Sequence, residues 1–361
     1  MDALEVAHRR LAAQHLSGPP LPDPHAVVRH LGAVQAQEYA MARWSLAQRS
    51  TGDDAAVRRA VDDGTVVRTH ALRPTWHFLA PEDLRWVQAL TGPRVQVFNR
   101  YYERQSGIDD DEAARSVAAM RHALRGGNHL TRAELAAALA TAGIEASGVR
   151  LAYLIMRAEL DAVVVNGAQR GRQQTYALAD ERVPDGLALA GDDALAELLR
   201  RYVTSHGPVT VKDASWWSSL TLTQVRRGLA LLSTEVTSEV VDGVAHWFVP
   251  GDEPARAPSP AVHVLQGYDE YFVAYTESRG VTNVAGRTIV PANPNQVIQP
   301  LVLDSQGIGW WRRVVERDRV VAELHLAVGL TGEQDAAVRA AFERLAAFVG
   351  VPVVLVGADP G

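Results

Sequence analysis

Apolar side chains return every three or four positions through most of the first 61 residues, a period that predicts amphipathic helices. These helices are expected over residues 3–16, 24–34, 41–48 and 53–61. Asp23 stands where an N-cap is favoured, and Pro24 suits a first helical position. Residues 65–70 and 75–79 read instead as two strands joined by a tight connection. Helices followed by a hairpin are the order of a winged helix.

The same order recurs twice further along the chain, after two helices expected from Pro81 and over residues 94–104. The second copy has a capping box at Thr131 and Glu134, which marks a helix start. Its other expected elements are helices 111–124 and 147–160 and strands 162–166 and 174–178. The third copy consists of helices 192–205, 210–218 and 221–232 and strands 236–241 and 244–249.

A proline-rich segment, residues 251–259, separates these copies from a part of the chain that is rich in strands. Strands are predicted over residues 262–265, 297–303, 309–315, 320–327 and 353–356, with one helix over 333–348. The fold class is therefore α+β: three tandem winged helices and a C-terminal β-rich domain, a partial barrel. The predicted domains are residues 1–108, 109–186, 187–251 and 260–361.

The chain has 361 residues and no cysteine, which excludes disulfides, zinc sites built on thiolates and cysteine nucleophiles. His70 and His77 have no third ligand nearby, so no metal site is expected. No phosphate-binding glycine loop is present, and we expect no cofactor. The amphipathic N-terminus is not typical of a secretory signal and no apolar run has transmembrane length, so the expected location is cytoplasmic, with no membrane partner.

The charge distribution limits any nucleic-acid site to a local surface, because the net charge is −6. Lys212 is the only lysine, so every other basic side chain is an arginine. Arginine binds phosphate with two parallel hydrogen bonds, and it cannot form a Schiff base. Three tandem winged helices with arginine on their wings favour a curved surface for duplex DNA.

Two glutamines, Gln35 and Gln37, follow the second predicted helix. On a helix these positions point about 200° apart, whereas in an extended segment they share a face. Each amide offers one carbonyl acceptor and two N–H donors, so two neighbouring amides can hold and aim one water molecule. Taken alone, a Gln-x-Gln pair is more often an ordinary polar connection.

The hairpin over residues 65–79 carries the densest set of candidate DNA contacts. Its basic residues are Arg68, His70, Arg73 and His77, on or near the tip, with Trp76 and Phe78 alternating between them. One interpretation is a wedge or phosphate clamp at a lesion. The alternative is that the aromatic residues are core and the histidines structural. We favour core for the two aromatic residues and DNA contact for Arg73, which precedes a proline and is held extended.

Two further groups are candidates for the site. Arg170 and Arg172 lie in the polar loop of the second hairpin, where a wing contacts the DNA backbone. Asp269 and Glu270 follow the proline-rich segment and could place negative charge beside a cationic intermediate. A solvated strand end explains these two acids equally well.

Three runs of sequence together resemble the AlkZ-like DNA glycosylases: 34–37, 69–78 and 268–271. The resemblance covers nearly the whole chain, and the run Thr-His-Ala-Leu-Arg-Pro-Thr-Trp-His-Phe makes it specific. It implies three winged helices in a C-shaped arrangement and excision of N7-alkylguanine, in some members from interstrand crosslinks. The catalytic glutamines of the family fall on Gln35 and Gln37. Aspartate replaces the second glutamine in a sister branch, so this chain resembles the Gln-x-Gln branch.

The chemistry of the lesion agrees with a pair of neutral amides. An N7-alkylated guanine is cationic and departs as a neutral base, so little acid catalysis is needed. Placing a water and stabilising an oxocarbenium-like sugar remain, and carbonyl acceptors do both. The expected partner is double-stranded DNA carrying N7-alkylguanine or a crosslink, bound by a monomer. The alternatives are a winged-helix transcriptional regulator without catalysis and a scaffold protein.

Overall fold

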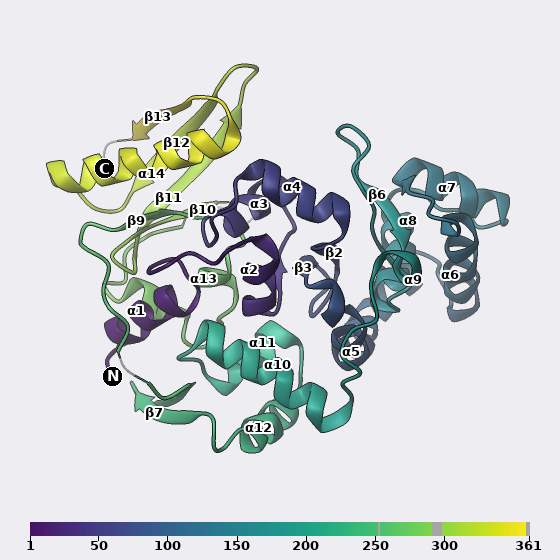
Figure 1. Ribbon diagram of the computed structural model, residues 1–361, viewed down its shortest axis with the longest axis horizontal. Coiled ribbons are helices and arrows are strands. Elements are labelled where there is room, and N and C mark those ends of the chain that lie inside the picture. The colour runs from purple at the N-terminus through teal and green to yellow at the C-terminus, as the bar shows by residue number, and fades with distance from the viewer. Residues whose placement is uncertain (252, 291–297, 359–361) are drawn as a thin grey trace.

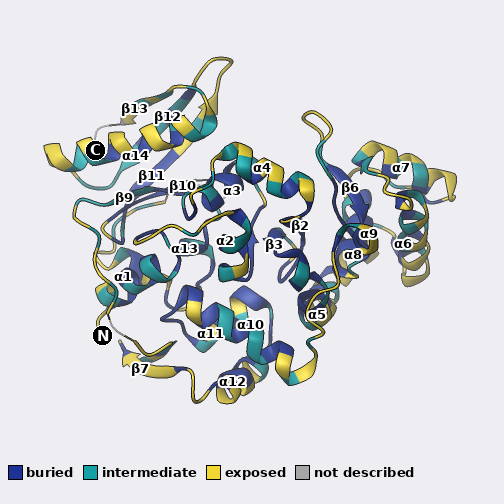
Figure 2. Cartoon of the chain, in the orientation of Figure 1, coloured by how far each residue is buried: buried dark blue, intermediate teal, exposed yellow. Residues whose placement is uncertain are grey.

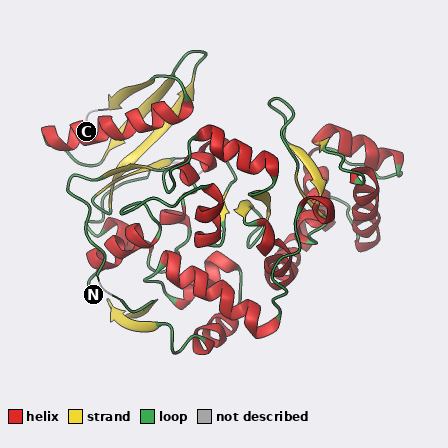
Figure 3. Ribbon diagram, viewed as in Figure 1, coloured by secondary structure: helices red, strands yellow, loops and turns green. Residues whose placement is uncertain are grey.

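The predicted order of helices and strands is present in the computed structural model, which describes residues 1–251, 253–290 and 298–358 (Figures 1 and 3). The first group is α1 (Ala3–Ala13), α2 (Pro24–Leu31), β1 (Val34–Gln35), α3 (Tyr39–Ala47), α4 (Asp54–Asp63), β2 (Val67–His70), β3 (Trp76–Leu79), η1 (Pro81–Asp83) and α5 (Leu84–Gln105). The side chain of Asp23 caps α2 by accepting from the Ala26 N–H, and Pro24 is its first residue. β1, β3 and β2 form a three-stranded antiparallel sheet.

One helix stands where two were predicted, because α5 continues through Pro93. A proline removes a backbone hydrogen bond and usually ends a helix. Here Trp86 and Val87 before the proline and Val95 after it are all buried, so packing on both sides maintains one element. The long helix leads into the next group.

The second and third groups agree with the predicted order. The second consists of α6 (Asp110–Leu124), β4 (Leu130–Thr131), α7 (Arg132–Thr141), α8 (Gly148–Leu160), β5 (Val164–Asn166), β6 (Thr175–Leu178) and the unpredicted α9 (Ala179–Arg182). The capping box of Thr131 and Glu134 is present at the start of α7. The third group is α10 (Gly191–His206), α11 (Val211–Ser218), α12 (Leu222–Leu231), β7 (Thr237–Val241) and β8 (Val244–Phe248).

The C-terminal part is a curled half-barrel sheet with α14 (Gly332–Val349) packed against it. Its strand order is β13 (Val353–Ala358), β12 (Val320–Leu326), β11 (Gln306–Val315), β10 (Gln299–Leu303) and β9 (Val262–Val264). All neighbours are antiparallel except β12 and β13. The strand predicted over 297–303 is confirmed from Gln299, whereas Val297 lies outside the described residues. The α+β class and the partial barrel are therefore confirmed.

The buried residues are distributed differently from the predicted domains (Figure 2). One cluster lies entirely within residues 108–178, and these form the lobe of α6, α7 and α8 in Figure 1. The largest cluster instead joins residues of the first and third groups, among them Leu72, Trp86, Tyr202 and Trp217, and it includes Val165, Ala179 and Val183 of the second group. The first and third groups therefore share a core to which the second contributes a few residues, whereas the exact boundaries and the number of winged helices stay predictions. No described helix is both long and apolar enough to cross a membrane.

A short segment between β9 and β10 was predicted as part of the C-terminal β-rich domain, but it packs elsewhere. It contains α13 (Glu270–Val273) and η2 (Arg279–Asn283). Tyr271 and Tyr275 are both 0% exposed, and the Tyr275 hydroxyl donates to the backbone of His206 in α10. The segment thus belongs to the interior of the N-terminal groups, beside β1.

Candidate active site

Gln35 lies on an extended segment after α2, as predicted, and Gln37 lies in the bend that follows it. Gly32 ends α2 with φ +77°, a conformation that favours glycine, and β1 then pairs with β3. Val34 and Ala36 are buried in the core on one side of the segment. Gln35 lies on the other side of β1 and is nearly covered, whereas Gln37, in the bend after β1, is exposed.

Gln35 is held at three atoms by residues from distant parts of the chain. Its side-chain oxygen accepts from Nη2 of Arg73 at 3.1 Å. Its backbone N–H donates to Glu270 at 2.8 Å, and its backbone carbonyl accepts from the amide of Gln266 at 3.1 Å. The side-chain oxygen of Gln37 accepts from the backbone N–H of Trp76 at 3.2 Å. A carbonyl has two lone pairs, so each glutamine retains one for a further donor.

Arg73 is an interior residue, 8% exposed, and its surroundings set its orientation. Its Nη2 also donates to Nε2 of His77 at 3.2 Å, while Nδ1 of that ring donates to the Thr75 carbonyl at 2.9 Å. Burial, with the nearby Arg73 charge, lowers the pKa of His77 to about 3, so the ring is neutral and can accept. Burial also lowers the pKa of Arg73, and the Glu270 charge acts against that shift.

Glu270 supplies a buried negative charge at the back of Gln35. Its second oxygen accepts from the indole N–H of Trp217 at 3.1 Å and lies 3.5 Å from Nε2 of His206. Burial alone would raise the pKa of this carboxyl, but its contact with His206 and the Arg73 charge lower the pKa to about 2. The group is therefore an anion at neutral pH. Glu270 thus places a negative charge beside Gln35, and its support of a cationic intermediate stays a prediction.

Asp269, the other predicted acid, points elsewhere. Its two oxygens accept from Nη2 and Nη1 of Arg49 at 2.6 and 3.0 Å, and both side chains are fully buried. The hydroxyl of Ser45 donates to it at 2.7 Å, and it accepts from the Tyr271 N–H at the start of α13. Its charge is neutralised by Arg49, so its role is to attach the 269–275 segment to α3. The alternative of a solvated strand end is wrong for both acids, because each is 0% exposed.

The hairpin is not the exposed basic tip that the sequence suggested. Arg68, His70 and His77 are each less than 10% exposed. Arg68 donates to the carbonyl of Ala36 at 3.0 Å and lies 4.5 Å from the ring centre of Trp76. His70 contacts the buried carboxylate of Glu159 in α8. These side chains are directed inward because α8 and β5 cover the hairpin.

The core assignment of the aromatic residues is confirmed for Phe78, whereas Trp76 is only half-buried. The wing arginines do lie on the surface. Arg170 is exposed, and it donates to Glu134 and to the backbone of His129. Arg172 is also exposed.

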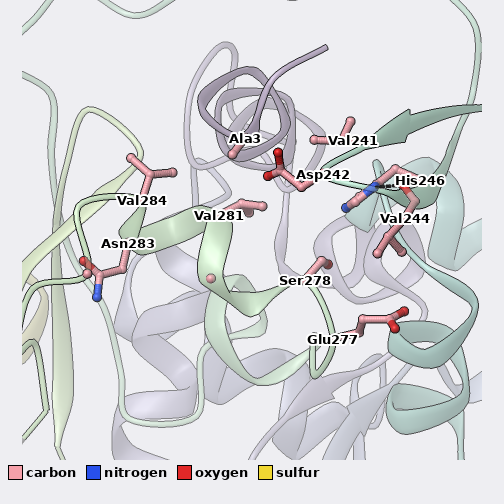
Figure 4. A pocket seen from close by; sticks show the side chains of 12 residues that line it. Ala3, Val241, Asp242, Val244, His246, Glu277, Ser278, Val281, Asn283 and Val284 are labelled. Atoms are coloured by element: carbon pink, nitrogen blue, oxygen red, sulfur yellow. Dashed lines mark hydrogen bonds between the residues drawn. The ribbon is translucent and has the colours of Figure 1, made fainter.

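A cavity of about 620 Å³ lies beside Gln35. Arg73, Pro74 and Thr75 line one side of it, α5 and α11 line others, and residues 268–279 complete it. This volume lies in the range of small-molecule sites, roughly 300–1,000 Å³. A second cavity, of about 440 Å³, lies between α1, β7–β8 and η2, and it is lined by Val241, His246 and Ser278 (Figure 4). That cavity contains neither glutamine.

Several site residues had only a weak signal in the sequence. Gln266, Trp217 and His206 all contact Gln35 or Glu270. Gln266 lies just before the 268–271 run, whereas Trp217 and His206 are remote from the motifs. The adjacent pair Trp216-Trp217 is the one hint, since neighbouring tryptophans are rare. Within the described residues, no group of three or more His, Cys, Asp or Glu side chains could hold a metal ion.

Three comparisons with known proteins agree with one another. A family model described as "DNA glycosylase AlkZ-like" matches residues 28–348. The interstrand DNA cross-link repair glycosylase of Streptomyces sahachiroi is 26% identical over 334 residues, which cover 86% of this chain and 88% of that protein. The solved structure of Streptomyces sahachiroi DNA glycosylase AlkZ has a TM-score of 0.77 at 22% identity, covering 99% of this chain and 100% of that one.

Proposed function

This chain belongs to the AlkZ-like DNA glycosylase family, and we propose that it hydrolyses the N-glycosidic bond of N7-alkylguanine in duplex DNA. Membership makes it an enzyme, so the alternatives of a regulator without catalysis and of a scaffold are set aside. The name of the Streptomyces sahachiroi relative supports the further proposal that interstrand crosslinks are among its substrates.

One observation carries the catalytic proposal: Gln35 is fixed at three atoms and borders a cavity, and Gln37 follows in the bend directly after its strand. The free lone pairs of the two side-chain carbonyls accept from one water and direct its oxygen at C1′. No reorganisation is needed when the bond breaks, because the Arg73 and Glu270 contacts already hold Gln35. Preorganised dipoles of this kind account for much of enzymatic rate enhancement.

Charge explains the restriction to cationic lesions. The departing base needs no proton when it is already positively charged, and within the described residues the carboxyl group in contact with Gln35 is that of Glu270. Neutral His77 and ionised Glu270 are both unable to donate a proton at neutral pH. The Glu270 anion offsets the buried Arg73 cation, so the site stays near neutral where positive charge develops on the sugar.

The test is excision from defined duplexes. Oligonucleotides carrying N7-methylguanine, O6-methylguanine or unmodified guanine are incubated with the protein, and abasic sites are revealed by alkaline cleavage. Release is expected from the N7-methylguanine duplex alone, because only that base is cationic. Equal release of the uncharged O6-methylguanine would contradict the mechanism. A fourth duplex with an N7–N7 crosslink tests the crosslink proposal separately.

A further inference from the structure

The cavity beside Gln35 has one polar part and otherwise apolar walls. Gln35 and Arg73 form the polar part. Phe98 of α5 and Trp216 of α11 line the walls, together with Leu220 and Val273. The proposed reaction uses the two polar residues and leaves the apolar walls without a role.

Phe98 and Trp216 are both 49% exposed, which is unusual for large apolar side chains facing a cavity. The indole N–H of Trp216 donates to the Val273 carbonyl at 3.0 Å, so the ring is anchored although half of the residue is uncovered. Apolar surface left in water costs free energy, and a contiguous exposed apolar patch often marks a binding surface. The two residues come from different groups of the fold yet line one cavity.

Cations stand at the edge of the same cavity. Arg94 and Arg279 are both exposed and line it, and the Arg94 guanidinium lies 5.1 Å from the ring centre of Phe98. Arg279 is oriented by two hydrogen bonds to the Tyr275 carbonyl. An aromatic surface flanked by arginines suits a flat ring attached to a phosphate backbone, since nucleobases stack on such side chains.

We propose that this cavity binds a flat aromatic group of the lesion between Phe98 and Trp216, either the modified guanine turned out of the duplex or an aromatic substituent on its N7. The inference rests on the proposed function and adds to it the site that recognises the lesion. Binding there places the reacting sugar beside Gln35. Base–aromatic stacking implies a loss of roughly 5- to 150-fold in lesion binding for each ring removed.

The experiment compares Phe98→Ala, Trp216→Ala and the conservative Trp216→Phe on two duplexes, one with N7-methylguanine and one with N7-(naphthylmethyl)guanine. Tyr101→Ala is the matched control, since it removes an exposed aromatic residue of α5 that does not line the cavity. Single-turnover excision is measured with protein below saturation, and binding to the lesion and unmodified duplexes is measured in parallel. Thermal unfolding checks that each variant is folded.

Both alanine variants are expected to lose excision and lesion preference, while Trp216→Phe and Tyr101→Ala retain most of both. An equal loss on the two duplexes identifies the guanine as the occupant, and a loss confined to the naphthylmethyl duplex identifies the substituent. Unchanged lesion preference in both alanine variants overturns the inference, as does an equal loss in Tyr101→Ala. If the wild type excises neither base, the proposed function fails, and the binding measurement still decides whether the cavity recognises the lesion.

Discussion

The side-chain carbonyl of Gln35 accepts a hydrogen bond from the guanidinium of Arg73, 3.1 Å away and 38 residues further along the chain. The same nitrogen donates to His77, directly across the sheet from Gln35. The sequence suggested Arg73 as a phosphate clamp, but its guanidinium lies against Gln35 in the interior. If Gln35 is catalytic as proposed, Arg73 is a positioning residue.

Replacing Arg73 is expected to slow excision without altering the electrostatics of DNA binding. Arg73→Met removes the donor, and loss of a hydrogen bond from a charged group corresponds to about 1.5–3 kcal/mol. The measurement is excision together with the salt dependence of duplex binding. Arg172→Ala, on the exposed wing, is the comparison: it should leave the excision step intact and reduce the salt slope by roughly 0.9. A shallower salt dependence of DNA binding in Arg73→Met than in the wild type would show that Arg73 contacts DNA phosphate.

The glutamine pair itself is tested by single substitutions. Gln35→Ala and Gln37→Ala should each lower the single-turnover excision rate, because removing one preorganised polar group costs about 2.7–4 kcal/mol of barrier. Affinity for undamaged DNA should change little. Gln105→Ala, at the exposed end of α5, serves as a control that removes an amide that does not line the cavity. Wild-type rates in both variants would disprove the catalytic assignment.

Local chemistry made the position of the glutamines predictable. Asp23, Pro24 and the glycine at position 32 fix where α2 begins and ends, so an extended Gln35 follows from neighbours in the sequence. The hairpin was also predictable from neighbouring residues, since two strand-like runs are joined by a tight connection. The residues around Gln35 were not, since Glu270 lies 235 residues further along and no local pattern brings it near.

The burial of the hairpin's polar side chains could not be predicted from the sequence either. An arginine before a proline in a tight turn is typical of a surface, and Arg73 is interior only because α11 and the 266–275 segment pack around the hairpin. Another helix, α8, packs against a different part of the hairpin and buries His70 against Glu159. The Asp269–Glu270 pair illustrates the difference between neighbours: one is neutralised by Arg49, the other contacts Gln35.

Stability should depend on pH through His77. Its pKa is about 3 in the folded protein and near 6.5 in the unfolded chain. Between these two pH values only the unfolded chain takes up the proton on His77. The contribution of His77 to the free energy of unfolding is therefore complete above pH 6.5 and is lost as the pH falls. The slope from this one group approaches about 1.4 kcal/mol per pH unit. The pKa of Glu270 is lowered to about 2 in the folded protein, so protonation of this group reduces stability only below its unfolded pKa of 4.5.

The measurement is denaturant unfolding of the wild type and of His77→Asn from pH 7 to pH 5, a window that Glu270 does not enter. The free energy of unfolding should fall more steeply with decreasing pH in the wild type than in the variant. Equal slopes would assign the proton uptake to other groups.

The product is expected to be an intact abasic site, because the chain offers no suitable amine. A glycosylase that also cuts the strand needs an amine that forms a Schiff base with C1′. Lys212, the only lysine, is exposed and paired with Glu277 at 2.5 Å, and the N-terminal amine contacts Glu239 in β7. We therefore expect water to be the nucleophile. Borohydride added during turnover should trap no protein–DNA adduct, and strands should break only after alkali or heat. Lys212→Ala should excise at the wild-type rate. An adduct formed by the wild type and absent from Lys212→Ala would replace the water mechanism with an amine, and Gln35 and Gln37 would then have to orient that amine.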